Sequence, residues 1–443
     1  MKLFLNLLMC FIAYILFVIS PLTYSYEFCL LIFFLYIIFN IIFLCVDDKS
    51  RKLGFEFLFM ISFFMTNFIY PVFYFTDNPT VSLFQFGFNH NVISKSSALA
   101  LLAYTFYILG VTNYKSAKIK KNDIVVSNSI FTVYLFLSIL TFTLFLISGG
   151  LTSFKDLYSG NSVNVGFSGY FMVIFSIFTT ILTVLLGFIK SRKLRLISFS
   201  YLLLIIILFL STGARLFALG IALIIIVQIS KYYKRIPLIF VLAILFLGAG
   251  FLHFIQILRE LGFDGNTGNA ISVLSEKSSI FDPFLDLIIN NRNLFVLVDF
   301  VDTYGYVYFL NILTSIFGVF PGISFFMGFF SIPQYMASGM LPTYLQFGMG
   351  GNFGLGTNMV GEAYLSLGVL GVVFVFWGFG AFIKFINNRC NYNIYYNLIY
   401  FYLVSQAVFY PRIDYLWGLR SIIWMVLFYF IIYNLLKVRK AKK

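Results

Sequence analysis

Long apolar runs separated by short polar segments dominate the sequence. Twelve runs stand out: residues 3–21, 28–46, 54–75, 96–113, 130–148, 168–189, 196–212, 214–230, 236–255, 357–383, 394–410 and 420–436. A helix needs about 20 mostly apolar residues to cross the hydrocarbon core of a bilayer. The pattern therefore predicts an all-α polytopic membrane protein with about 12 transmembrane helices, forming a single integral membrane domain over residues 1–443. No small-residue cleavage site follows the first run, so we interpret it as a retained helix.

The composition supports the membrane interpretation. Hydrophobic residues make up 61% of the 443 positions and charged residues only 10%. Soluble domains average about 45–50% apolar and about 25% charged residues. The chain has too little polar surface for a soluble globule, and disorder needs the opposite composition.

The basic residues predict which loops face the cytoplasm. Of the 30 Lys and Arg residues, 22 lie in one set of alternate loops, which includes both ends of the chain. Cytoplasmic loops carry an excess of Lys and Arg, so both termini are expected in the cytoplasm. The net charge of +14 then follows from topology, and no nucleic acid partner is expected. Most acidic residues fall on the other face, which we take to be external.

One external segment is much longer than the others. Residues 256–356 contain most of the external acidic residues, and their middle, 294–330, is apolar but interrupted by Asp299 and Asp302 and broken by Pro321-Gly322. We expect a large periplasmic loop with interfacial or re-entrant helices over the membrane face. A closely packed pair of extra spans is the alternative.

Motifs of soluble enzymes and metal sites are missing from the sequence. There is no Walker A motif, no GxSxG and no GxGxxG after a strand. The two histidines, His90 and His253, form no HExxH, and the four cysteines are scattered, so we expect neither a metal nor a cofactor.

Arginines near the external ends of spans are candidates for anion binding. Arg215 follows a tight turn at Thr212-Gly213, and Arg420 begins the last span. Guanidinium is always charged and presents a fork that matches phosphate oxygens. The alternative for Arg215 is a side chain that extends to lipid headgroups.

Two further sets of residues near the external ends of spans could also bind phosphate. His253, Gln256 and Arg259 are at helical spacing that continues the ninth span out of the membrane, and Arg259 could instead pair with Glu260 or Asp264. Arg412 lies in a very short external loop, where it could bind phosphate or simply pair with Asp414.

Glu362 is the candidate general base. Asn358, Glu362 and Ser366 are four residues apart in the segment Gly354–Gly371, so they are predicted to share one helix face. A carboxylate in the first turns of a membrane helix is costly unless it is paired or used, and a structural pair with an external arginine is the alternative. A cationic cluster would stabilise a leaving phosphate, and the carboxylate would take a proton from an acceptor hydroxyl.

These segments resemble the Wzy-type O-antigen or oligosaccharide repeat-unit polymerases. The Thr-Gly-Ala-Arg215 turn, the large external loop and the stretch Gly354–Gly371 with Glu362 carry the resemblance. It implies a GT-C-like fold and a metal-independent glycosyltransferase at the periplasmic face of the bacterial inner membrane. Such an enzyme moves a growing glycan from undecaprenyl pyrophosphate onto a lipid-linked repeat unit. The implied catalytic residues are Glu362 and Arg215, and the implied substrate-binding residues are Arg259, Arg412, Arg420, Asn358 and His253.

The resemblance also implies partners and leaves alternatives. The expected partners are the undecaprenyl-pyrophosphate-linked oligosaccharide and a chain-length regulator in the membrane. An O-antigen ligase would use the same donor with a lipid A-core acceptor. A polysaccharide flippase should show two similar halves and a basic central cavity, and neither is evident in this sequence.

Overall fold

The computed structural model describes residues 2–46, 53–75, 88–113, 126–151, 166–211, 215–233, 281–320, 333–348 except 338, and 355–441, with a few isolated positions between them. Every regular element in this described part is a helix. The long helices are α1 (Lys2–Val18), α2 (Tyr26–Val46), α3 (Phe55–Asn67), α4 (Ile93–Asn113), α5 (Asn128–Ile147), α7 (Gly166–Leu186), α8 (Arg192–Ser211), α9 (Arg215–Gln228), α17 (Met359–Arg389), α18 (Ile394–Gln406) and α19 (Leu419–Ala441).

Nine helical segments in the described residues are long and apolar enough to cross a bilayer. The chain is therefore a multi-pass membrane protein. Helix α1, with 17 residues, and α18, with 13, fall short of that length although both occupy predicted spans. The predicted span 236–255 lies mostly outside the described residues, so the count of twelve stays a prediction.

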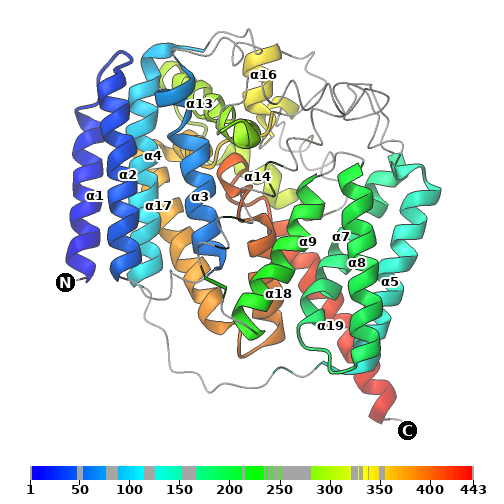
Figure 1. Ribbon diagram of the computed structural model, residues 1–443. Coiled ribbons are helices and arrows are strands. Elements are labelled where there is room, and N and C mark those ends of the chain that lie inside the picture. Colours follow the sequence, from blue (N-terminus) through cyan, green and yellow to red (C-terminus); the bar gives the residue numbers. More distant parts are fainter. Residues whose placement is uncertain are drawn as a thin grey trace, which may run out of the picture.

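The long helices form two groups that lie side by side (Figure 1). Helices α1, α2, α3, α4 and α17 make up one group, and α5, α7, α8, α9, α18 and α19 make up the other. The two ends of the chain lie at the same end of the molecule. At the opposite end lie α13 (Asn291–Tyr304) and α16 (Leu341–Phe347), with α14 (Leu310–Phe317) deeper between the two groups. The short helix α12 (Leu285–Ile288) precedes α13 in the chain.

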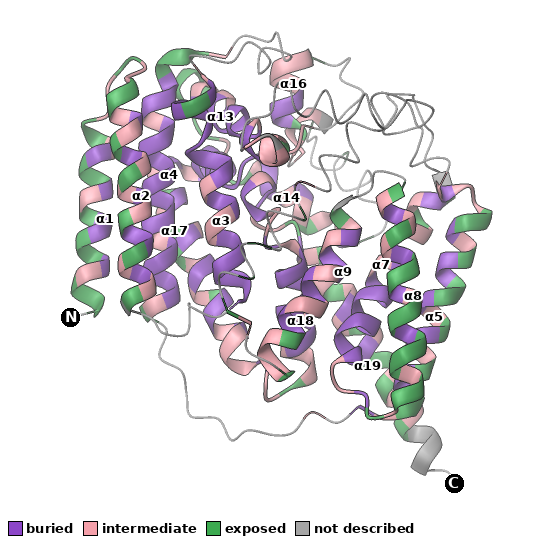
Figure 2. Ribbon diagram, in the orientation of Figure 1, coloured by how far each residue is buried: buried purple, intermediate pink, exposed green. Residues whose placement is uncertain are grey.

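The exposure of the residues distinguishes the outer helices, which would face lipid, from the helices of the core. Figure 2 shows α4 largely buried, whereas α1 and α8 carry exposed residues along their outer sides. Apolar side chains such as Phe4, Phe11 and Ile207 are exposed there, as expected where lipid replaces water as the solvent.

Glycines let α4 and α17 approach closely. A Cβ atom on Gly380 would overlap the carbonyl oxygen of Tyr107, and one on Gly110 would overlap that of Trp377. Small residues at such reciprocal positions are how membrane helices bring their backbones into contact. This contact anchors α17, which carries Glu362.

Helix α17 is broken near its start. Leu367 and Gly368 leave helical geometry, and Gly368 has φ 61°, which favours glycine. The carbonyl of Leu365, near this break, accepts a hydrogen bond from the amide of Val307 (3.0 Å). A Cβ on Gly368 would lie 2.7 Å from the ring of Tyr306, so the residues before α14 pack against the break. The break separates a short segment with Glu362 from the long remainder of the helix.

Candidate functional site

Glu362, in the first turn of α17, is enclosed by residues from distant parts of the chain. Its side chain is only 1% exposed. One carboxylate oxygen accepts hydrogen bonds from the hydroxyl of Thr357 (2.7 Å) and the amide of Gly339 (3.4 Å), and the other accepts one from the amide of Asn311. The first turn of α17 is thereby tied to α14 and to the segment before α16. The expected structural alternative, a pair with an external arginine, is not what these contacts show.

Asn358 caps α17 instead of lying on its face. Its side-chain oxygen accepts hydrogen bonds from the amides of Val360 (3.0 Å) and Gly361 (3.4 Å), which is N-cap geometry. Its amide group donates to the side-chain oxygen of Asn67 (3.0 Å). Asn291 donates to the carbonyl of Asn67 (3.0 Å), so the end of α3 joins α17 to the start of α13. Asn358 therefore has a structural task.

The segment after α18 brings further polar groups to Glu362. Helix α18, with 13 residues, extends about 20 Å, which is less than the ~30 Å hydrocarbon core of a bilayer. Asp414 is buried and close enough to Glu362 to repel it electrostatically. Tyr415 and Ser366 are joined through their hydroxyls (3.2 Å). Burial raises the pKa of Tyr415, so its phenol stays neutral.

Arg412 lines a cavity of about 150 Å³ beside this centre. Its carbonyl oxygen accepts a hydrogen bond from the amide of Thr357 (3.2 Å), whose hydroxyl contacts Glu362. The cavity is also lined by Asp286, Ile289, Asn290, Arg292, Asn293, Gln346 and Leu355. Two arginines thus line one polar space, which we call the Arg292–Arg412 cavity.

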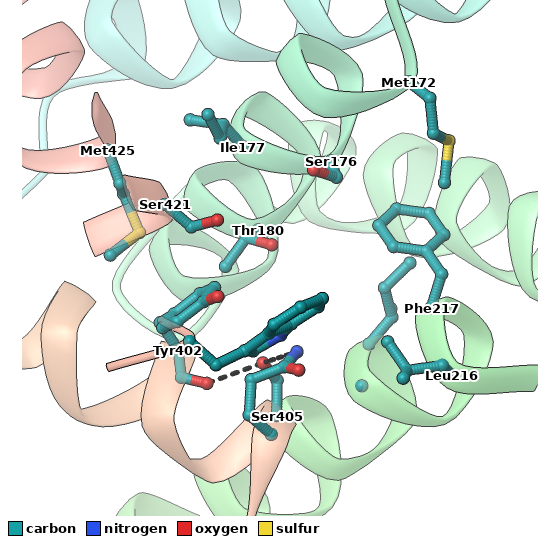
Figure 3. Close-up of a pocket in the computed structure, with 14 residues that line it drawn as sticks. Met172, Ser176, Ile177, Thr180, Leu216, Phe217, Tyr402, Ser405, Ser421 and Met425 are labelled. Atoms are coloured by element: carbon teal, nitrogen blue, oxygen red, sulfur yellow. Dashed lines mark hydrogen bonds between the residues drawn. The ribbon is translucent and has the colours of Figure 1, made fainter. Parts of the chain in front are cut away.

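A second cavity, of about 190 Å³, lies between α7, α9, α18 and α19. Figure 3 shows Thr180, Tyr402 and Ser421 on neighbouring walls, with Met425 and Phe217 adding apolar surface. On its floor the hydroxyl of Ser405 donates to the carbonyl of Tyr402 (2.6 Å) and accepts from Gln406 (3.2 Å). We call it the four-helix cavity; its lining combines apolar groups with hydroxyls.

Two of the predicted arginines precede residues that line the four-helix cavity. Helix α9 begins at Arg215, directly before the lining residue Leu216. Arg420, in the first turn of α19, directly precedes Ser421, is exposed, and interacts electrostatically with the phenol of Tyr402. The side chain of Arg215 and all of His253 and Arg259 lie outside the described residues.

The sequence analysis missed most of the amides at this site. Asn290, Arg292, Asn293 and Asn311 are all buried, yet the sequence analysis proposed none of them as a site residue. The run Asn-Asn-Arg-Asn at 290–293 was the available signal, because four adjacent polar residues at the start of an apolar helix need buried partners.

No group of three or more His, Cys, Asp or Glu side chains in the described part could hold a metal ion.

Comparison with known proteins identifies the family. The chain matches the family described as O-antigen polysaccharide polymerase Wzy over residues 4–443, which is essentially its whole length. No curated protein and no solved structure matches it. The match indicates a polymerase role in O-antigen synthesis and accords with the many apolar helices. The chain therefore belongs to the Wzy family of O-antigen polysaccharide polymerases.

Proposed function

We propose that this protein transfers a growing glycan from undecaprenyl pyrophosphate onto a lipid-linked repeat unit at the periplasmic face of the inner membrane. The family match over residues 4–443 carries the proposal. The excess of Lys and Arg in the loops on the side of both termini supports the orientation. Helices α13 and α16 lie at the end opposite the two termini (Figure 1), and this end would then be periplasmic. A GT-C-like arrangement is part of the same proposal.

The donor's diphosphate fits best at the four-helix cavity. Arg215 and Arg420 stand in the first turns of α9 and α19, directly before residues that line it. Amide groups at helix starts and guanidinium groups both favour an anion. The apolar part of the lining, including Phe217 and Met425, suits the first units of a lipid chain. In this proposal Arg215 stabilises the leaving diphosphate, and Arg259 and His253 contribute to the same substrates.

Glu362 is proposed to accept the proton of the acceptor hydroxyl. Its carboxylate is enclosed, so that hydroxyl must replace the contact with Asn311 or with Gly339. Both partners come from the long segment between the two groups of spans, outside α17 itself. Movement of that segment would open the carboxylate to substrate.

The deletion phenotype tests the proposed function. Cells that lack this protein should make lipopolysaccharide with a single repeat unit, because the first unit is still ligated but not extended. Complementation with the intact chain should restore the ladder of long chains. Loss of every repeat unit would indicate a ligase or a flippase, and an unchanged ladder would exclude all three activities.

A further inference from the structure

Three exposed tyrosines lie at the end of α13 and in its connection to α14. Tyr304 is 76% exposed, Tyr308 72% and Tyr306 46%. We call residues 304–309 the tyrosine loop. Rings this exposed gain little from packing, and clusters of exposed apolar groups mark sites of interaction. The loop leads from α13, at the end opposite the termini, to α14 between the two helix groups (Figure 1), so it lies on the proposed periplasmic side.

The tyrosine loop is held in one conformation. The amide of Val307 donates a hydrogen bond to the carbonyl of Leu365 (3.0 Å) in α17. Tyr308 (φ 48°) and Phe309 (φ 65°) both have left-handed backbone geometry, which is unfavourable for bulky side chains. Strain of this kind persists only where neighbouring contacts enforce it, and it gathers at binding sites. The rings of Tyr306 and Tyr308 are thus presented in a fixed arrangement, with centroids 6.3 Å apart and planes at 87°.

A charged pair borders these rings. The ammonium of Lys95 lies 2.7 Å from a carboxylate oxygen of Asp302, and the two side chains are 28% and 34% exposed. The hydroxyl of Tyr364 donates to the same oxygen of Asp302 (3.2 Å), and the ring of Tyr364 lies 6.5 Å from that of Tyr306. Aromatic faces and charged hydrogen-bonding groups therefore share one surface.

This combination matches the two-sided chemistry of a sugar ring. The C–H face of a pyranose packs on the electron-rich face of an aromatic ring, while its hydroxyls hydrogen-bond to carboxylate and ammonium groups. Tyrosines at a membrane interface are also exposed, but recognition of an anionic lipid surface depends on clustered Lys and Arg. Here two carboxylates, those of Asp299 and Asp302, lie in the last turns of α13, just before the loop. The charges favour a glycan.

We propose that the tyrosine loop is a glycan-binding subsite, which holds sugar rings of the growing chain beyond the reacting end. The assignment to the growing chain rests on the proposed polymerase function. Asn311, two residues after the loop, donates to Glu362, so a glycan on the loop would continue toward the candidate base. Rings held here would slow the loss of the chain between successive transfers, and would thereby influence how long the chains become.

Binding of the cell's own O polysaccharide to the full-length protein in lipid nanodiscs tests the subsite. The polysaccharide is released from lipopolysaccharide by mild acid, so it carries no lipid, and calorimetric titration measures its binding. Poly(vinyl alcohol), which has hydroxyl groups but no sugar ring, is the control polymer. The polysaccharide should bind and poly(vinyl alcohol) should not.

Substitutions then assign the binding to the loop. Tyr304→Ala with Tyr308→Ala removes two rings and leaves Tyr306 in place, and it should weaken polysaccharide binding by about tenfold or more. Tyr304→Phe with Tyr308→Phe keeps the rings and should retain most of the binding. Tyr170→Ala is the matched control, because Tyr170 is 69% exposed at the start of α7, in the other helix group. If the double alanine variant is poorly produced, Tyr304→Ala alone makes the same test, with an effect of about threefold expected.

Chain length in cells tests the link to the growing chain. The double alanine variant should shift the lipopolysaccharide ladder to shorter chains at normal protein abundance, because chains dissociate sooner. The double phenylalanine variant and Tyr170→Ala should keep the normal ladder. Weaker binding in the alanine variant together with an unchanged ladder would overturn the assignment to the growing chain.

Three results would overturn the subsite itself: no binding of the O polysaccharide, equal binding of poly(vinyl alcohol), or polysaccharide binding that is unchanged in both alanine variants. Lower abundance of these variants with unchanged binding would assign the rings to the membrane interface instead. These results are independent of the polymerase proposal. That proposal fails only if cells without the protein keep their long chains, whatever the purified protein binds.

Discussion

At the residue scale, Glu362 has two possible tasks that the structure makes separable. Its contacts with Thr357, Gly339 and Asn311 join three segments, which is a positioning task. Its place in the first turn of a membrane helix, beside Asp414, suits a base. A substitution that removes the charge but keeps the shape distinguishes the two.

Glu362→Gln is expected to abolish chain extension while the protein remains in the membrane. The glutamine still accepts hydrogen bonds from Thr357 and Gly339 but cannot take a proton, which should cost at least about 10²-fold in rate. Its new amide group faces the amide of Asn311, so Glu362→Gln with Asn311→Asp restores that hydrogen bond. Lipopolysaccharide chain length and protein abundance are measured together. Long chains in the double variant would assign Glu362 to positioning.

The polymerisation rate is expected to depend on the shape of the Arg215 side chain as well as on its charge. If it holds the leaving diphosphate, its contact strengthens as charge develops, and Arg215→Ala should lower the polymerisation rate by at least about 10²-fold. Arg215→Lys should recover only part of the activity, because the fork is lost. Arg192→Ala, at the start of α8, is the control. Full activity in Arg215→Lys would indicate that Arg215 contacts lipid headgroups. Arg259 and Arg420 would then be the better candidates for binding the diphosphate.

At the element scale, the contact between α4 and α17 depends on glycine. Gly380→Ala would push a methyl group into the carbonyl of Tyr107, so it should lower stability by about 1–3 kcal/mol, the usual range for overpacking. Gly378→Ala, two residues away on the same helix, meets nothing within 4 Å and should be neutral or slightly stabilising. Thermal unfolding of the two purified variants makes the comparison. Equal melting temperatures would argue against close packing at this crossing.

The elements show how far the sequence could predict the site. Apolar runs predict where helices are, because hydrophobic length is a local property. The break at Leu367–Gly368 depends on Tyr306, some sixty residues away, so no local pattern marks it. The enclosure of Glu362 by Asn311 and Gly339 is likewise a tertiary contact. Spacing could find Glu362 and Arg412, but it could not find Arg292, whose burial is decided by the packing of α13.

At the scale of the whole molecule, topology decides which substrates can reach the site. The two ends of the chain lie at the same end of the structure (Figure 1), so the number of crossings must be even. Within the part of the chain that the structure describes, the nine candidate spans together with α1 and α18 make an odd number. A crossing at residues 236–255, which lie mostly outside the described part, stays a prediction and would make the count even.

A reporter that is active only in the periplasm tests this topology. Fused after Lys443 it should be inactive, because the last loop carries five basic residues and such loops stay in the cytoplasm. Inserted after Gly265, beyond the predicted ninth span, it should be active. Insertion after Lys121, within another basic loop, is the matched control and should be inactive. Activity after Lys443 with silence after Gly265 would reverse the membrane orientation, and would place Glu362 and both cavities on the side where no periplasmic acceptor could reach them.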